Sequence, residues 1–342
     1  MTALLSNFSW GNGPYCRAVQ LALLSAKSED KIIIPLVYGD RQKRILKEET
    51  PSEHQHRLHF DEIAGGVLKE LMFSGNDYFS FLKSLIEKVP RAKDRLQEHF
   101  SNQDLRFCVG RNSLFALLPG REVSTSFVSH ADLFAASAKE EKFKNHKNLL
   151  EEAATLFAGF QKEFSALYLG EPCIALPQSV DYQKVPPLVP GTKIGSETPT
   201  AGQHIYVTVS GLDKLEKSYE QLPSADEAVL SKKIGRWQGQ VALPDILSHP
   251  QFSEHWARPS WNAIWSMITL NKPLFCLPAA EGDDPEMYWN KKTLEELGLY
   301  CRPGQRFPHD RLQALREELI KKYGDLKGLE YSAKKIATLM NC

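Results

Sequence analysis

Apolar positions follow two different spacings along the first part of the chain. Residues 3–6 form a short apolar run, and residues 31–37 (KIIIPLV) form a β-branched run of the kind that is buried in parallel sheets. Between them, residues 15–26 repeat apolar side chains every three to four positions, which predicts a helix. The order strand, helix, strand indicates an α/β fold with a parallel sheet.

The same alternation continues for most of the first half of the chain. We expect charged or apolar helices, strand pieces between residues 105 and 130, and one further strand over residues 173–176. The helices are predicted over residues 41–48, 78–88, 92–100 and 149–168. Together these elements predict one α/β unit.

A second unit is predicted after a stretch rich in proline and glycine, residues 185–202 (VPPLVPGTKIGSETPTAG), which opposes regular structure. Residues 204–210 then read as a strand, and residues 212–221 as a helix, so the β–α pattern starts again. A strand with a loop at residues 235–241 and a short helix at residues 243–249 are also expected. The predicted divisions are a first domain, a linker, a second domain and closing helices, over residues 1–184, 185–202, 203–309 and 310–342.

Composition narrows the functional classes. A chain of 342 residues with 42% hydrophobic and 25% charged residues suits two globular domains. Its 42 basic and 42 acidic residues balance, so no overall field directs it to nucleic acid or to an anionic membrane. The sequence has neither a basic leader before an apolar core nor 18 consecutive apolar residues, which predicts a cytoplasmic protein without a membrane span.

Cysteine and histidine usage predicts no metal centre. The six cysteines stand singly without a C-x-x-C pair, so the sequence suggests neither a zinc ribbon nor a disulfide framework, and it fits a reducing compartment. His54, His56 and His59 lie close together, but no cysteine or H-E-x-x-H companion accompanies them. We therefore interpret them as part of a polar surface and assign no metal.

The richest chemistry lies between residues 256 and 290. Ser260 precedes an apolar helical run over residues 261–270, the Asn-Lys-Pro triplet that ends at Pro273 stops that run, and residues 274–277 read as a short buried strand. Carboxylates follow at Glu281, Asp283, Asp284 and Glu286. Ligands of α/β sheets bind at the carboxyl ends of strands, where helix N-termini favour anions. The segment therefore predicts a phosphate site beside acceptors suited to sugar hydroxyls.

This order of residues resembles the donor-site signature of GT-B glycosyltransferases, the nucleotide-sugar-dependent superfamily of UDP-glycosyltransferases and MurG-like enzymes. That pattern runs H-x-G-W-N-S, then an acidic residue, G-x-P, a strand ending in proline, and D-Q-x-x-N. Trp261 and Asn262 fall on the W-N pair, and Glu286 with Met287 falls on the Asp-Gln pair. The chain departs from the pattern at the histidine, glycine, serine and acidic positions, which are Arg258, Ser260, Ala263 and Ser266.

The departures affect different parts of the expected chemistry. Arg258 can still fork onto phosphate oxygens, so the resemblance implies that it contacts the diphosphate. Ser266 replaces the acid that binds ribose, so the usual nucleotide contacts are altered. Ser210 and Gly211, at the end of the first strand of the second unit, could offer further amides to a phosphate.

A second region of resemblance is the first strand-to-helix turn, with Gly11, Asn12 and Gly13. Glycines there permit a tight turn and a close approach of ligand to backbone. In similar glycosyltransferases this turn lies on the acceptor side and often carries a His or Asp as the general base. Asn12 cannot accept a proton in that role, so no catalytic residue is assigned.

Structural interpretations compete with these assignments. Trp261 and Trp265 lie four apart on an apolar helix, which is typical of core packing. Ser260 suits a helix N-cap whatever its function, and Arg258 suits a surface ion pair. The acidic run EGDDPE at residues 281–286 suits a solvated turn.

The resemblance implies two Rossmann-like domains with a cleft between them and C-terminal helices that cross back to the first domain. The second domain would bind a nucleotide-diphosphate sugar, with the phosphates at Arg258 and Ser260 and the sugar hydroxyls at Asp284 and Glu286. Transfer would need neither metal nor cofactor, and the acceptor would be a small molecule, a lipid-linked molecule or a glycan. Two alternatives remain: a nucleotide-sugar hydrolase or epimerase on this fold, and a non-catalytic descendant that binds nucleotide sugar.

Overall fold

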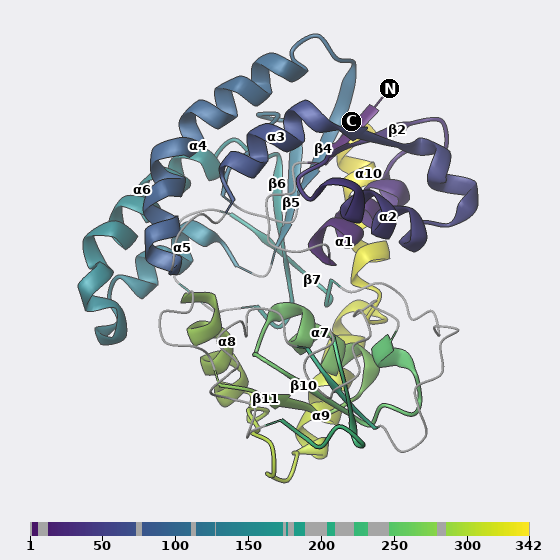
Figure 1. Ribbon diagram of the computed structural model, residues 1–342, viewed down its shortest axis with the longest axis vertical. Helices are drawn as coiled ribbons and strands as arrows, with labels where there is room; N and C mark the ends of the chain where they lie inside the picture. The colour runs from purple at the N-terminus through teal and green to yellow at the C-terminus, as the bar shows by residue number, and fades with distance from the viewer. Residues whose placement is uncertain are drawn as a thin grey trace. The chain divides into compact units, whose positions relative to one another are not determined.

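The chain divides into two units in the computed structural model (Figure 1). The first unit comprises Met1–Leu188 and Gly328–Cys342, and the second comprises Val189–Lys327. The N-terminal segment of the first unit ends at Leu188, whereas the sequence predicted a domain end at residue 184. The segment extends further because Val185 still pairs with Gly170 in the first sheet. The structure describes residues 2–5, 13–72, 77–110, 114–126, 128–173, 176, 181–188, 204–208, 222–231, 246–278 and 285–341.

The first unit is built on a parallel sheet whose strand order, within the described residues, is β3-β2-β1-β4-β5-β6-β7. Buried β-branched and aromatic residues fill the strands, as expected for a sheet covered on both faces. The order reverses between β1 and β4, which lie side by side. The strands are β1 (Thr2–Leu5), β2 (Lys31–Pro35), β3 (Leu58–Asp61), β4 (Leu105–Gly110), β5 (Glu122–Ser126), β6 (Ala166–Gly170) and β7 (Gln183–Val185).

Helices of the first unit form two connected groups (Figure 1). One group is α1, α2 and α10, and the other is α3, α4, α5 and α6. Side chains cap several of their N-termini: Asp61 accepts from the Ala64 amide, and Asp77 accepts from the amides of Phe79 and Ser80. The helices are α1 (Gly13–Ser25), α2 (Gly39–Glu49), α3 (Glu62–Glu70), α4 (Tyr78–Phe100), α5 (His130–Ser137), α6 (Lys147–Gln161) and α10 (Gly328–Asn341), with short 3-10 helices η1 (Ser52–Arg57) and η2 (Glu141–His146).

Two sequence expectations for this unit were wrong at their boundaries. The helices expected over residues 78–88 and 92–100 are one helix, α4, with Pro90 inside it. Its buried stripe continues on both sides of Pro90, through Leu85, Val89 and Ala92, and the proline itself is exposed. Water can therefore satisfy the carbonyl that lacks its amide partner, while core packing holds the helix together.

The helix expected over residues 149–168 ends at Gln161. The residues that follow form β6, where Tyr168 pairs with Thr125 of β5, and no strand is assigned at residues 173 or 176. The run ALYLG fits a helix and a buried strand equally well in sequence. Pairing with β5 decides between them.

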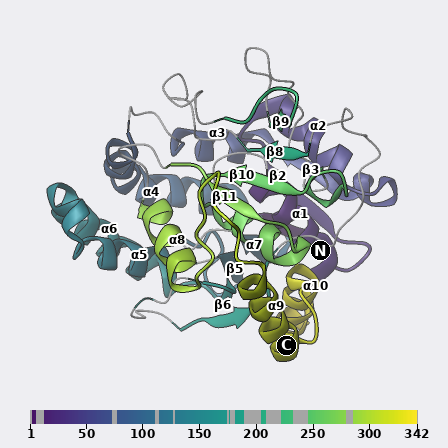
Figure 2. The same cartoon turned by 90° about the horizontal axis from the view of Figure 1, so that it is seen from below.

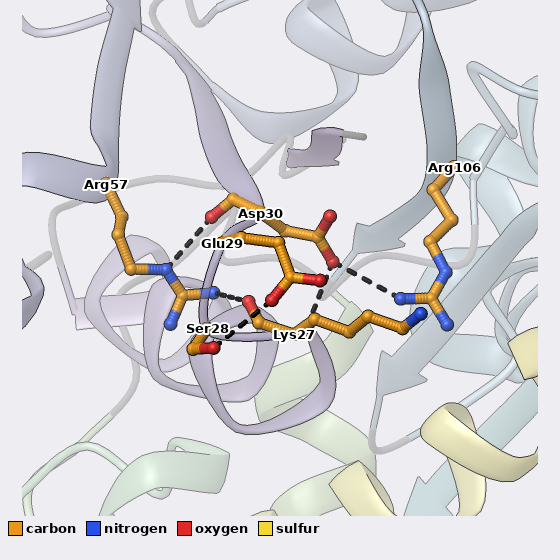
Figure 3. Close-up of polar contacts among 6 residues, drawn as sticks. All are labelled: Lys27, Ser28, Glu29, Asp30, Arg57 and Arg106. Atoms are coloured by element: carbon orange, nitrogen blue, oxygen red, sulfur yellow. Dashed lines mark hydrogen bonds and ion pairs between the residues drawn. The ribbon is translucent and has the colours of Figure 1, made fainter.

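Polar side chains close the amino ends of β2, β3 and β4 (Figure 3). Asp30 lies just before β2, and its Oδ2 accepts from the Lys27 amide at 2.9 Å and from Arg106 Nη1 at 3.2 Å. Arg57, just before β3, donates from Nε to the Asp30 carbonyl at 2.9 Å and from Nη2 to the Lys27 carbonyl at 2.5 Å. Asp30, Arg57 and Arg106 thus hold a turn against three strands, and we call this group the Asp30 cluster.

The second unit contains a second parallel sheet with the order β11-β10-β8-β9 within its described part. Figure 2 shows these strands side by side in that order. The order reverses between β8 and β10, as it does between β1 and β4 in the first unit. The strands are β8 (Ile205–Val207), β9 (Ala228–Leu230), β10 (Glu254–Ala257) and β11 (Leu274–Cys276), and the helices are α7 (Trp261–Leu270), α8 (Pro285–Glu296) and α9 (His309–Tyr323), with the 3-10 helix η5 (Ile246–Ser248).

The two closing helices belong to different units. We expected all of residues 310–342 to pack toward the first domain. Helix α9 contacts α7 of the second unit, where Arg316 donates to the carbonyls of Ile268 and Thr269. Only α10 belongs to the first unit, where it contacts α1 and β7. Gly328, at its start, lies so close to the Pro186 and Pro187 carbonyls that a Cβ would clash. Helix α9 therefore packs against the second unit, and helix α10 packs against the first.

Some expectations lie outside the described residues: the linker beyond residue 188, the helix at 212–221 and the strand at 235–241. Among the described residues, no helix has the length and apolar character to span a bilayer. The described residues also contain no group of three or more His, Cys, Asp or Glu side chains placed to share a metal ion.

Candidate functional site

The turn from β10 into α7 lies at the carboxyl end of β10, beside the point where the strand order of the second sheet reverses. Arg258, Pro259 and Ser260 form it. The Ser260 amide donates to the Arg258 carbonyl at 2.6 Å, and the Ile264 amide donates to the Ser260 carbonyl at 2.9 Å as the first helical bond. Ligands of open α/β sheets bind at strand ends beside such a reversal, which makes residues 258–260 a candidate site. We call them the donor turn, after the donor site that the resemblance implies.

Ser260 occupies the N-cap position of α7, but its hydroxyl makes no capping hydrogen bond within the described structure. The capping role expected for its side chain is therefore not used. A helix N-terminus carries a partial positive charge and directs amides outward. With Arg258 two residues earlier, the start of α7 concentrates groups that attract an anion.

Helix α7 itself is anchored in the core. Trp261 is 3% exposed and Trp265 is 0% exposed, and their ring centroids lie 5.8 Å apart. The structural interpretation of these tryptophans is thus confirmed for Trp265, and the Trp261 indole also lies in the core rather than on the surface. Asn262, in the first turn, remains partly exposed. Asn271, with a φ of 56°, ends the helix in the left-handed conformation.

Asn290 links the donor turn to helix α8. Its side chain is fully buried, and its Nδ2 donates to the Pro259 carbonyl at 2.7 Å and to Glu286 Oε1 at 3.3 Å. Glu286 lies in the first turn of α8, partly exposed, and follows β11 as the acidic cluster was expected to do. The structure therefore brings Glu286 to the same end of the sheet as Arg258 and Ser260. It lies on a helix, whereas the sequence suggested a turn.

The strands that flank the reversal are joined by a partly buried polar pair. His255 of β10 lies 2.8 Å from Thr208 Oγ1, measured from its Nε2, and Thr208 directly follows β8. Burial lowers the pKa of His255 to about 3, so the ring is neutral at physiological pH. The sequence analysis singled out neither residue, because the neighbouring residues do not distinguish a buried histidine in a strand from an exposed one. The pair adds a side-chain contact to the backbone pairing of β10 with β8.

Several predicted site residues lie outside the described part of the structure: Gly11, Asn12, Ser210, Gly211 and Asp284. Gly13 is the first residue of α1, at the carboxyl end of β1 in the first unit. The described residues that the structure gathers around the donor turn are therefore Arg258, Ser260, Trp261, Asn262 and Glu286, all in the second unit.

The carboxyl end of β5 in the first unit carries polar residues that the sequence prediction missed. Ser124, Thr125 and Ser126 are buried in the strand, and His130 and Asp132 lie in the first turn of α5, which follows it. Surrounding protein lowers the pKa of His130 to about 4, although part of the side chain remains exposed. The signal for this group was present in the sequence as a strand of hydroxyl residues before S-H-A-D, but it has no distinctive spacing.

No family model matches the sequence, and no curated protein matches it. Solved structures do match over almost the whole chain. SnogD, a glycosyltransferase from Streptomyces nogalater, is 15% identical, with a TM-score of 0.57, 99% of this chain covered and 100% of the other. UGT89C1 from Arabidopsis thaliana, complexed with UDP-L-rhamnose, is 12% identical, with a TM-score of 0.59 and 100% and 99% covered.

A UDP-glucosyltransferase from Polygonum tinctorium, capable of glucosylating indoxyl, is 10% identical, with a TM-score of 0.60 and 100% and 98% covered. These structures are GT-B glycosyltransferases with two Rossmann-like domains, and each unit of this chain has the parallel sheet and the order reversal of such a domain. The chain therefore has the GT-B fold.

Proposed function

We propose that the protein is a glycosyltransferase that moves a sugar from a nucleoside-diphosphate donor to an acceptor. The observation that carries the proposal is the donor turn, in which Arg258 and the start of α7 lie together at the carboxyl end of β10. The similar structures support the donor class, because one is complexed with UDP-L-rhamnose and another is a UDP-glucosyltransferase. UDP sugars are accordingly the first donors to test.

The donor turn suits the departure of a nucleoside diphosphate. When the bond from the anomeric carbon to phosphate breaks, negative charge grows on the leaving phosphate oxygens. Arg258 and the amides of Trp261 and Asn262, at the start of α7, would bind that charge more strongly in the transition state than in the ground state. Because the charge is met by arginine and helix amides, we propose transfer without a metal ion or cofactor. Turnover that persists in excess EDTA supports this part, and its loss refutes it.

Sugar hydroxyls would be held by Glu286, together with Asp284 from the preceding segment. Carboxylates accept hydrogen bonds from adjacent hydroxyls, and Glu286 is partly exposed near the donor turn. The acceptor would be bound by the first unit, at the turn that contains Gly11, Asn12 and Gly13. A small molecule, a lipid-linked molecule or a glycan suits this role.

The proposal is tested by a thermal-shift screen over UDP, other nucleoside diphosphates and their sugars, because a specific ligand stabilises the folded state by mass action. Product analysis with and without acceptor sugars then separates the alternatives. Sugar released to water indicates a hydrolase, and an isomerised donor indicates an epimerase. Saturable binding without turnover indicates a non-catalytic descendant. No stabilisation by any nucleotide would contradict all of these readings.

A further inference from the structure

Asn290 makes a contact that periodicity in the sequence does not reveal. Its Nδ2 donates to the carbonyl of Pro259, 31 residues earlier in the chain, at 2.7 Å. The same nitrogen lies 3.3 Å from Glu286 Oε1, one helical turn away on α8. One buried amide group therefore contacts both the donor turn and the carboxylate proposed to hold the sugar.

The contact is made to the Pro259–Ser260 peptide of the donor turn. Pro259 has no amide proton, so its carbonyl is its only polar backbone atom. The Ser260 amide is already used within the turn, on the Arg258 carbonyl. The peptide that joins Pro259 to Ser260 is thus held on both sides, by the Arg258 carbonyl at its N–H and by Asn290 at its C=O. This peptide sets the direction in which Arg258 leaves the turn and the first amides of α7 point.

An asparagine at this buried position indicates that the side chain orients its hydrogen-bond partners and does more than fill space. Asn290 is 0% exposed, yet its Oδ1 makes no hydrogen bond within the described residues. A buried acceptor left without a partner destabilises the fold. An apolar residue would fill this space without that loss, but it could not donate to Pro259.

We infer that Asn290 is a positioning residue, which couples the phosphate-binding turn to the sugar-binding end of α8. The inference rests on the proposed function for its ligand, but the geometry that carries it is that of the protein alone. Asn290 acts through Arg258 and the α7 amides and contacts no reacting atom itself. Its removal should therefore weaken diphosphate binding through the turn, and the effect should depend on Arg258.

The test is a double-mutant cycle read by calorimetry with UDP. Asn290→Ala should raise the UDP dissociation constant about three- to tenfold in the wild-type background. In the Arg258→Ala background, Asn290→Ala should raise the UDP dissociation constant by a clearly smaller factor, because the guanidinium that Asn290 positions is already absent. Thr293→Ala is the matched control: its hydroxyl donates to the Trp289 carbonyl at 3.0 Å on the same helix, and its loss should leave UDP affinity unchanged.

Hydrogen exchange of residues 258–264 without ligand separates this inference from the proposed function. Asn290→Ala should speed exchange there relative to wild type and to Thr293→Ala, whether or not UDP binds. If wild type binds no UDP, the proposed function fails and the exchange result alone decides the positioning role. Unchanged exchange overturns the inference, as does an Asn290→Ala effect on UDP that is absent or equal in both backgrounds.

Discussion

The Asp30 cluster and the donor turn are both polar groups at the ends of parallel strands, and they are held together by different groups. At the amino edge of the first sheet, Arg57 and Arg106 donate to Asp30 and to backbone carbonyls. At the carboxyl edge of the second sheet, backbone atoms and Asn290 hold the turn that carries Arg258.

The difference follows from the direction of the backbone at the two edges. Helices that enter from a strand's carboxyl end begin there, so their N-terminal amides and positive charge gather on that edge. The amino edge offers no such field, and polar side chains there serve to satisfy the turns between helix and strand. Arginines near strand ends should therefore separate by edge into stabilising and ligand-binding residues.

The largest expected effect is at the amino edge. Asp30→Ala removes the buried carboxylate, 1% exposed, that Arg106 and the Lys27 amide share, so it should lower the free energy of unfolding by about 3 to 5 kcal/mol. Urea denaturation measures this, and UDP affinity of the folded fraction should not change. Glu29→Ala, in the same turn but exposed, should leave the unfolding midpoint where it is. A stable Asp30→Ala protein with weakened UDP binding would reverse the proposed division.

The second prediction concerns His255 of β10. It tests whether a residue near the carboxyl edge of the second sheet contributes to stability without binding ligand. Burial lowers the pKa of His255 from 6.5 to about 3, so the folded protein resists its protonation and the unfolded chain does not. Its stabilising contribution is complete above pH 6.5 and is lost as the pH falls toward 3. Between pH 7 and pH 4.5, wild type should lose about 2 to 3 kcal/mol more than His255→Gln. Equal losses in pH-dependent denaturation would show that His255 is not held neutral.

Arg258→Ala is expected to weaken UDP binding by about 1 to 3 kcal/mol, because a charge-assisted bond to phosphate is lost. Calorimetry measures the affinity. Arg311→Ala removes the same charge from an exposed site on α9 of the same unit and should not alter it. Equal UDP affinity of wild type and Arg258→Ala would remove Arg258 from the site.

The smallest effect is expected for Glu286→Gln. The glutamine carbonyl can still accept from Asn290, so the melting temperature should hardly move. Loss of the charge should weaken binding of a UDP sugar by about 1 kcal/mol, and UDP alone should bind as before. Glu295→Gln, on an exposed position of the same helix, is the control. A large loss of stability with intact sugar-nucleotide affinity would make Glu286 a structural residue.

Sequence alone predicted the elements whose limits are set locally. Helix α7 occupies the predicted residues 261–270, because Ser260 is extended before it, Asn271 takes the left-handed conformation after it, and Pro273 prevents its continuation. The buried strand β2 and helix α1 follow in the same way from β-branched and helical periodicity. The resemblance to GT-B proteins also rested on this local pattern, and the fold that it implied is the one observed.

Other features needed partners from distant parts of the chain. ALYLG became β6 because β5 lies beside it, and α4 continues through Pro90 because a core covers its other face. The contact of Asn290 with Pro259 joins two helices' ends across 31 residues, and no spacing in the sequence announces it. Periodicity and caps report interactions within a few residues, whereas strand pairing and buried hydrogen bonds depend on which segments the tertiary fold brings together. The sequence therefore determined where α7 begins, and the tertiary structure decided how its first turn is held.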